Sequence, residues 1–296
     1  MKTNLVQESD TMTTFEVKRP FKLLIYEERA DTVYITLNRP EANNALSFQL
    51  SDELVAAIEL VRQSRAIKFL VIRGAGQNFC AGDDITEMFR WGDANAIMRR
   101  VRHYQNMANA LEELDKVTIA AVDGFAVGGG LEITMACDFV IATERARWGM
   151  PEVDVGITPG WGGTTRMARL IGRRRTKEIN LIGALHPARR AVEWNLWNRV
   201  VPVGELEQET DRLLDVLRVK NQQAVRQLKF IINKNVEADL YTAQGFEMLS
   251  AGLTGAVNGM WDVDDADHGR GIAGFQAKNE LWKSRRGVAQ NFWVED

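Results

Sequence analysis

Hydrophobic and polar residues alternate along the chain with two different periods, which separate predicted strands from predicted helices. Short apolar or strictly alternating runs are typical of strands, whereas apolar positions three and four residues apart indicate helices. The predicted strands are residues 23–28, 33–38, 67–74, 118–124, 138–143 and the short run 199–202. The predicted helices are residues 47–63 with Ser47 as N-cap, 85–114, the segment opened by Gly128–Gly130, and most of 162–195.

The order of these elements predicts an α/β fold. Strands alternate with helices, and residues 67–74 form a nearly continuous apolar run of the kind that parallel sheets bury on both faces. Residues 1–20 are polar and are expected to form a tail, and residues 21–204 hold the strand–helix alternation. Residues 205–296 are predicted to be helical, with a glycine-rich interruption around residues 252–274.

Composition adds an ordinary globular character and excludes several classes of protein. The chain has 296 residues, of which 45% are hydrophobic and 26% charged, and its net charge is −3. Neither a nucleic-acid surface nor a membrane-surface patch is indicated, and the basic clusters at 173–177 and 189–190 are expected to be solvated helix faces. No secretory signal or membrane span is indicated. Because Cys80 and Cys137 lie in apolar stretches, buried thiols and a cytoplasmic location are expected.

Common cofactor and metal motifs do not fit the chain. The segments Gly74-x-Gly76 and Gly128-x-Gly130 are not followed by a third glycine at the spacing of a dinucleotide fingerprint. A Walker loop and a G-x-S-x-G elbow are absent from the sequence. We therefore expect no cofactor and no bound metal. The three histidines show no ligand spacing and are expected on the surface or in polar networks: His103, His186 and His268.

Two glycine-rich turns of similar design give the strongest local signal. In each, a predicted strand ends and leads into a predicted helix, once through residues 81–84 and once through residues 128–130. Such turns present free backbone N–H groups at a positive helix terminus, and glycine lets a ligand approach the main chain closely. Two N–H groups that converge on one point stabilise a developing oxyanion.

Two acidic residues accompany these turns. Glu132 follows the glycine triplet within an apolar stretch, and Glu152 follows 20 residues later, after a strand that can return the chain to the same cleft. Two carboxyl groups beside oxyanion donors can add or remove water next to a polarised carbonyl. The residues alone leave an alternative open, in which Glu132 and Asp84 complement helix starts and the glycines permit tight packing.

The chain resembles the enoyl-CoA hydratase/isomerase (crotonase) superfamily over roughly residues 22–275. The resemblance rests on "LNRPEANNALS", "NFCAGDDITEM", "AAVDGFAVGGGLEITMACDFVIA", "WGMPEVDVGITPGWGGTTRMARLIG" and, more weakly, "GIAGF", which occur in the family's order and spacing. It implies a crotonase-like spiral of β-β-α turns with a helical C-terminal region, assembled as homotrimers or hexamers. Because this fold carries many reactions, the activity has to be argued from the site.

The resemblance also implies which residues form that site. Gly129 and Asp83 match the two backbone donors that hold the carbonyl of an acyl-CoA thioester. Glu132 matches the water-activating base of the hydratases, and Glu152 the acid that gives a proton to C2. The implied reaction is hydration of a 2,3-trans-enoyl-CoA to a 3-hydroxyacyl-CoA, with coenzyme A as part of the substrate. The further residues expected at the substrate are Ala81, Gly82, Asp84, Ile85, Gly128 and Trp161.

Other reactions of the superfamily on acyl-CoA stay open, namely isomerisation, hydrolysis and hydratase-lyase cleavage. A non-catalytic, RNA-binding role is less favoured, because the chain is acidic and keeps both acids. The expected partners are thus an acyl-CoA substrate and further copies of the chain, without nucleic acid or membrane. Tryptophan side chains are expected to form apolar surface that the assembly covers: Trp194, Trp197, Trp261 and Trp282.

Several positions depart from the family pattern. Asp83 stands where a small or apolar residue is usual, and its carboxylate opposes growing negative charge unless it points away or is paired. Trp161 fills a usually smaller position, where it either trims or stacks on an acyl group or belongs to the core. An unusual or aromatic acyl group is therefore expected. Ala42 replaces a basic residue, and the candidates for the lost phosphate contact are Lys278, Lys283, Arg285 and Arg286.

Overall fold

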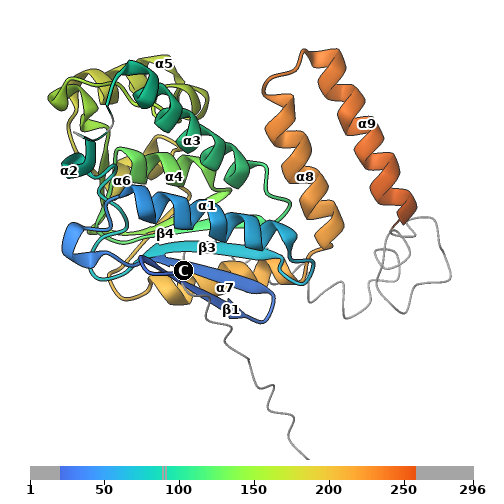
Figure 1. The fold of residues 1–296 in the computed structure, drawn as a ribbon. Helices are drawn as coiled ribbons and strands as arrows, with labels where there is room; N and C mark the ends of the chain where they lie inside the picture. The colour runs from blue at the N-terminus through green and yellow to red at the C-terminus, as the bar shows by residue number, and fades with distance from the viewer. Residues whose placement is uncertain (1–20, 89, 91, 258–296) are drawn as a thin grey trace, which may run out of the picture.

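The computed structural model describes residues 21–88, 90 and 92–257, and within them the strands pair into two sheets (Figure 1). The strands are β1 (Leu24–Arg29), β2 (Thr32–Leu37), β3 (Phe69–Gly74), β4 (Val117–Val122), β5 (Phe125–Val127), β6 (Phe139–Thr143), β7 (Arg147–Gly149), β8 (His186–Pro187) and β9 (Arg199–Val201). The α-helices are α1 (Phe48–Gln63), α2 (Ile85–Met88), α3 (Ala94–Glu112), α4 (Gly129–Ala136), α5 (Thr165–Ile182), α6 (Ala188–Glu193), α7 (Leu206–Arg218), α8 (Gln222–Asn235) and α9 (Leu240–Val257). Two 3-10 helices complete the fold, η1 (Pro40–Ala42) and η2 (Pro151–Val155).

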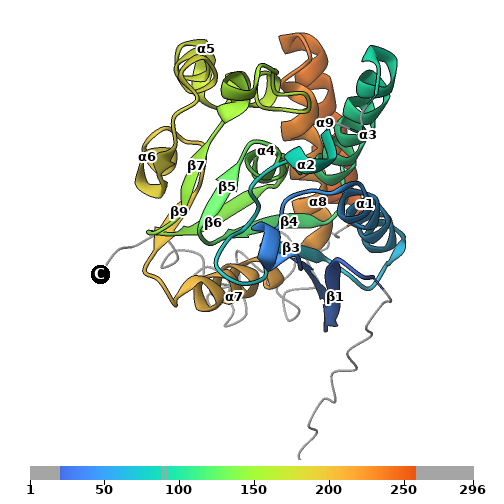
Figure 2. The same ribbon diagram turned by 60° about the vertical axis from the view of Figure 1, so that its left-hand side comes forward.

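The chain winds as a spiral in which successive turns contribute to both sheets. The larger sheet has the order β1-β2-β3-β4-β6-β9 and is parallel except for the β1–β2 hairpin, whereas the smaller sheet has the order β5-β7-β8. From β4 the chain enters β5, crosses α4, returns to the larger sheet in β6 and enters the smaller one again in β7 (Figure 2). Isolated bridges, Leu46 to Asp83 and Cys80 to Ala126, extend this pairing to the earlier turns. The predicted spiral of β-β-α turns is confirmed.

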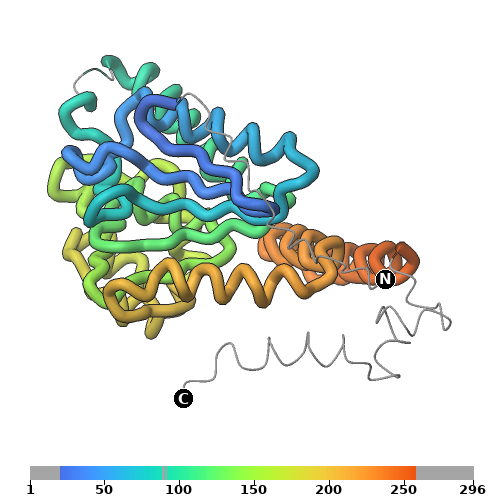
Figure 3. Tube along the Cα trace, turned by 90° about the horizontal axis from the view of Figure 1, so that it is seen from below, coloured from blue at the N-terminus to red at the C-terminus, as the bar shows by residue number. Residues whose placement is uncertain are grey.

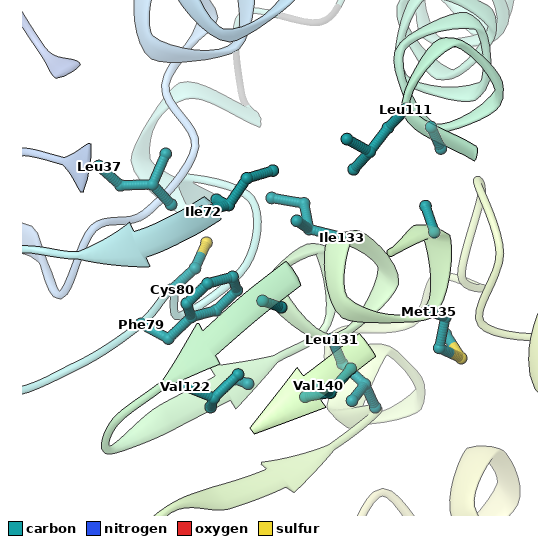
Figure 4. Close-up of a cluster of buried hydrophobic side chains, with 14 of the residues drawn as sticks. Leu37, Ile72, Phe79, Cys80, Leu111, Val122, Leu131, Ile133, Met135 and Val140 are labelled. Atoms are coloured by element: carbon teal, nitrogen blue, oxygen red, sulfur yellow. The ribbon is translucent and has the colours of Figure 1, made fainter. Parts of the chain in front are cut away.

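The larger sheet is covered on both faces, which explains its nearly continuous apolar strands. In β3, Leu70 and Ile72 join the main core cluster under α1, α3 and α4, whereas Phe69 and Val71 join a second cluster under α7. Figure 4 shows Ile72 in the main cluster, on the same side of the sheet as Ile133 of α4. The prediction that residues 67–74 form a strand buried on both faces is therefore confirmed for β3.

The single helix predicted over residues 85–114 is wrong, because the chain breaks it into α2 and α3. Gly92 adopts a left-handed φ of 78°, which a helix interior does not allow. Asp93 then caps α3, with its side chain accepting a hydrogen bond from the backbone N–H of Ala96 at 2.9 Å. The separation lets α2 and α3 form different walls of one cavity.

Helices follow the last strand, as predicted, up to residue 257. Helix α7 packs on the larger sheet, while α8 and α9 form a hairpin that projects from the body of the molecule (Figures 1 and 3). The predicted glycine-rich interruption does not begin at Gly252, since α9 continues through Gly252 and Gly255 to Val257. The rest of that segment and the basic candidates of the C-terminus lie outside the described residues. No helix in the described ranges is long and apolar enough to cross a membrane.

The expectation that Trp194 and Trp197 form uncovered surface is wrong. Trp197 is 3% exposed and its indole N–H donates to Thr134 Oγ1 at 3.3 Å. Trp194 is half-buried and meets the ring of the buried Trp148 edge-on at 6.1 Å. Both rings therefore pack within the protomer, and the other two tryptophans of this expectation lie outside the described residues.

Candidate active site

A cavity of about 830 Å³ lies between α2, α3, η2 and the glycine-rich loop after η2. Its walls are largely apolar, and three carboxyl groups reach it, those of Asp83, Glu132 and Glu152. The chain between the two glutamates, which runs through β6 and β7, thus returns to one cleft, as their spacing suggested. Of the ten residues predicted for the site, five line this cavity: Asp83, Ile85, Glu132, Glu152 and Trp161.

The two glycine-rich turns lie side by side beneath the cavity. The bridge between Cys80 and Ala126 brings the strand ends together, and Gly82 and Gly128 then turn the chain with φ values of 95° and 53°. A Cβ atom on Gly82 would lie 2.8 Å from the carbonyl oxygen of Val127. Only glycine at residue 82 permits this approach, which is the close packing that the sequence suggested.

Two backbone N–H groups at these turns have no acceptor within the described residues, those of Asp83 and Gly129. Leu46 pairs with the residues on either side of Asp83, so the Asp83 N–H faces away from this ladder. Gly129 is the first residue of α4, where an N–H has no partner inside the helix. Two free donors on adjoining turns are the arrangement that an oxyanion requires.

Glu132 lies on α4 and is only 1% exposed. Its Oε1 atom accepts hydrogen bonds from the backbone N–H groups of Trp161 at 3.0 Å and Gly163 at 2.7 Å. Burial raises the pKa of Glu132 to about 8; the two N–H donors act against that rise, and the charges of Asp83 and Glu152 add to it. The carboxyl group of Glu132 therefore titrates near neutral pH instead of in the acid range.

Glu152 is the second residue of η2, directly after Pro151. Its Oε2 atom is buried and accepts no hydrogen bond from any described residue. Burial and, to a smaller extent, the charge of Asp83 raise the pKa of Glu152 to about 7. The pKa values of both glutamates are raised toward neutrality, so either carboxyl can hold or release a proton near neutral pH, which suits general acid–base chemistry.

Asp83 does not point away from the site, since its side chain lines the cavity. Burial raises its pKa to about 6, while Trp161, Arg100 and Tyr104 favour the ionised form. No salt bridge to Asp83 forms within the described residues, because the guanidinium of Arg100 instead bonds Asp52 at 3.3 Å. The carboxylate that the sequence singled out is thus not turned away, and it forms no salt bridge with a described cation.

Trp161 is at once core and cavity wall. It is 3% exposed, belongs to the main core cluster and stacks on Tyr104 with 5.4 Å between ring centroids. Its ring also lies against the turn at Gly128–Gly130, because a Cβ atom on Gly129 would come within 2.6 Å of Trp161 Cζ2. The core alternative for this residue is confirmed, and contact of its ring with an acyl group stays a prediction.

Other predicted site residues hold the first turn in place. Asp84 accepts from the guanidinium of Arg39 at 3.0 Å and from the backbone N–H of Thr86 at 3.0 Å, which caps α2. The N–H of Ala81 donates to the carbonyl oxygen of Asn43 at 3.0 Å. Their contact with a substrate stays a prediction. Sequence reasoning missed Tyr104, which lies on the buried stripe of α3 and differs from its apolar neighbours only by its hydroxyl.

Comparison with known proteins places these features in a family. The profile of the family Enoyl-CoA hydratase/isomerase matches residues 27–259, and the chain belongs to this family. It is 37% identical over 229 residues to a short-chain-enoyl-CoA hydratase of Clostridium acetobutylicum, covering 76% of this chain and 86% of the relative. It is 35% identical over 238 residues to a crotonyl-CoA hydratase of Syntrophomonas wolfei, covering 79% and 90%. The crystal structure of an enoyl-CoA hydratase from Bacillus anthracis superimposes with a TM-score of 0.73 at 34% identity, covering 77% of this chain and 89% of that one.

Proposed function

We propose that the protein is an enoyl-CoA hydratase that reversibly adds water to a 2,3-trans-enoyl-CoA and forms a 3-hydroxyacyl-CoA. One observation carries this proposal: Glu132 and Glu152 line the same cavity beside the free N–H groups of Gly129 and Asp83. An enzyme that only moves a double bond needs one acid–base group, whereas water addition uses two. The hydratases named among the relatives support the same reaction.

In the proposed reaction, the N–H groups of Gly129 and Asp83 bind the thioester oxygen and draw electron density from C3. The carboxylate of Glu132 takes a proton from water as the water oxygen bonds to C3. Glu152 gives its proton to C2, and the negative charge leaves the thioester oxygen as the carbonyl re-forms. Removal of one donor of this kind typically lowers the rate by about 10²–10³. The reaction needs no cofactor besides the coenzyme A of the substrate.

The names of the relatives and the apolar walls support a short acyl chain as the group that enters the cavity. Trp161 and Tyr104 close one side of the space with a stacked pair of rings, which favours a flat, unsaturated acyl group next to the oxyanion turn. A homotrimer or hexamer in the cytoplasm, without nucleic acid or membrane partners, completes the proposal.

The proposal is tested by replacing each acid with its amide. Glu132→Gln and Glu152→Gln should each lower kcat for crotonyl-CoA hydration by at least about 10²-fold, because each removes one proton transfer. Asp154→Asn, an exposed change on the same η2 element, is the control and should retain activity. The loss of enoyl absorbance gives the rate, and mass spectrometry identifies the product. Hydration at the wild-type rate by Glu132→Gln would contradict the mechanism and favour a one-acid isomerase.

A further inference from the structure

Three carboxyl groups meet in the cavity of about 830 Å³, and no cationic side chain of the described residues lines it with them. They belong to Asp83, Glu132 and Glu152, and the other described lining residues carry no charge. The proposed hydration uses the two glutamates as base and acid, but it uses only the backbone N–H of Asp83. The carboxyl of Asp83 is therefore an acid in the cavity without a part in the reaction.

The surroundings of Asp83 keep its carboxyl charged without neutralising it. Burial raises its pKa to about 6, and the neutral side chains of Trp161 and Tyr104 favour the ionised form. Arg100 acts in the same direction, but it does not line the cavity and its guanidinium bonds Asp52 at 3.3 Å. Neutral donors stabilise a carboxylate and leave its net charge unchanged. Above neutral pH the cavity thus holds the charge of Asp83 in addition to that of the catalytic base.

The acyl chain of a bound thioester begins beside this charge. The N–H of Asp83 is free for the thioester oxygen, so the acyl carbons extend into the space that the Asp83 side chain lines. Most of the remaining wall is apolar and supplies no cation among the described residues. An acyl group that ends in a carboxylate brings a further negative charge into this space, where like charges repel more strongly than in water.

We propose that the Asp83 carboxylate excludes enoyl-CoA thioesters whose acyl chain ends in a carboxylate, so that the enzyme accepts uncharged enoyl groups. Asp83 is then a specificity-determining residue, and this inference rests on the proposed function and names its substrate class. Discrimination of this kind comes from repulsion of the wrong substrate, and like charges brought together in a binding site weaken binding by orders of magnitude.

The test compares two trans-enoyl thioesters of similar shape that differ in charge, 4-carboxybut-2-enoyl-CoA and its amide, 4-carbamoylbut-2-enoyl-CoA. At about pH 7.5 the kcat/KM of the wild type for the amide should exceed that for the acid by at least about 100-fold. Asp83→Asn removes the charge and keeps the shape of the side chain, so this ratio should fall by at least about 10-fold. Because the readout is a ratio within one variant, a general loss of activity does not imitate the effect.

Desolvation of the substrate carboxylate also favours the amide, and the variants separate this contribution from repulsion. Apolar walls desolvate the acid equally in Asp83→Asn, whereas repulsion by the aspartate is gone. Asp154→Asn removes an exposed acidic charge of η2 outside the cavity lining and should leave the ratio unchanged. Asp83→Ala serves if Asp83→Asn does not fold. A wild-type ratio of about one, or an unchanged ratio in a folded Asp83 variant, overturns the inference.

Binding of unreactive analogues separates this inference from the proposed reaction. Calorimetry gives Kd for 4-carboxybutanoyl-CoA and 4-carbamoylbutanoyl-CoA, and the wild type should bind the amide at least about 10-fold more tightly, with Asp83→Asn losing most of that preference. If no enoyl-CoA is hydrated while this preference and its loss are observed, the proposed function fails and the charge selection stands. If crotonyl-CoA is hydrated and the preference is absent, the proposed function stands and the inference is overturned.

Discussion

Gly129 is the residue on which the oxyanion proposal depends most directly. Gly129→Pro removes the N–H, so kcat should fall by about 10²–10³ or more. Proline is tolerated at a first helical position, but any Cβ at residue 129 meets Trp161 at 2.6 Å. Gly129→Ala is therefore the matched control, since it introduces the same contact and keeps the donor. The kcat difference between the two variants measures the donor, and equal activity of both would exclude that role.

The effect of the Asp83 carboxyl on activity can be measured separately from that of its backbone N–H. In the wild type the ionised carboxylate lies beside the site where negative charge grows. If Asp83 contributes to hydration of crotonyl-CoA only through its N–H, Asp83→Ala should retain that activity or gain some, because like-charge repulsion is relieved. Retained folding is checked by Tm. A collapse of crotonyl-CoA hydration in the folded variant would place the carboxylate in the chemistry itself.

Glu132 also sets how the stability of the protein depends on pH. Burial raises its pKa from the ordinary 4.5 of a glutamate to about 8 in the folded chain. Between these pH values the folded state therefore binds more protons than the unfolded one. The free energy of unfolding therefore falls as pH rises through this window. Glu132→Gln removes the titration and should be more stable than wild type by about 1–3 kcal/mol at pH 8, with little gain near pH 5.

Thermal unfolding at both pH values measures this difference, which should reach at least about 2 °C in Tm at pH 8. Glu59→Gln, on the exposed side of α1, is the control and should show no pH-dependent gain. A Glu132→Gln variant that is less stable than wild type at pH 8 would mean that the ionised carboxylate holds the loop through Trp161 and Gly163. The amide oxygen of glutamine still accepts from both N–H groups, which argues against that result.

At the scale of elements, α8 depends on one buried ion pair. No residue of α8 is fully buried. Lys229 Nζ nevertheless lies 2.7 Å from Oδ2 of Asp138, the residue before β6, and donates to the Lys116 carbonyl oxygen at 2.9 Å. Burial raises the pKa of Asp138, and the charge of Lys229 opposes that rise. Lys229→Met leaves a buried acid without its cation and should destabilise the fold by about 3–5 kcal/mol in urea unfolding.

Lys234, on the same helix, provides the matched control. It pairs with Glu113 at the surface, where the two side chains are 43% and 57% exposed. Lys234→Met should change the free energy of unfolding by no more than about 1 kcal/mol. Similar losses in the two variants would show that α8 is held by its helix contacts and not by the Asp138 pair.

The sequence predicted long, strongly periodic elements better than short ones. Residues 67–74 were recognisable because both faces of β3 are buried, but β5 has only three residues and depends on pairing with β7, which no local pattern reveals. The break before α3 was missed although Gly92 and Asp93 are ordinary stop and start signals. The interruption predicted from Gly252 was also wrong, because α9 continues through this residue. A glycine inside a helix costs about 1 kcal/mol relative to alanine, which the rest of α9 tolerates.

For the site, the sequence predicted which acids come together but not the contacts that hold them. Glu132 and Glu152 could be paired from their spacing and the strand between them, and the cavity brings them together. The sequence could not reveal that Glu132 is held by the N–H groups of Trp161 and Gly163, because that contact joins segments about 30 residues apart through a loop without regular structure. The surroundings of Asp83 likewise depend on how α3 packs against this loop.

For the whole molecule, the α8–α9 hairpin leaves apolar side chains uncovered by the described part of the protomer. The residues more than half exposed are Leu228, Ile232, Val236, Leu240, Tyr241, Met248, Leu249, Leu253 and Val257. A patch of this kind marks an interface. We therefore expect a homotrimer or hexamer that buries roughly 2,000 Å² or more per contact, as obligate interfaces do.

Light scattering after size-exclusion chromatography at micromolar concentration gives the mass of the assembly, and a monomer would contradict this expectation. Leu249→Glu combined with Leu253→Glu places two charges on the apolar side of α9 and should lower the mass. Gln244→Glu adds charge to an exposed polar position of the same helix and is the control. If the double variant keeps the wild-type mass, the assembly uses another surface.

The two halves of the candidate site are held by different parts of the molecule. The donors at Asp83 and Gly129 belong to turns fixed by the bridge between Cys80 and Ala126, whereas Glu152 and Trp161 lie on η2 and the loop that follows it. Changes in that loop can alter the acid or the acyl pocket without disturbing the sheet. A chain built this way can acquire new reactions by successive loop substitutions, each starting from a scaffold that already folds and already activates a thioester.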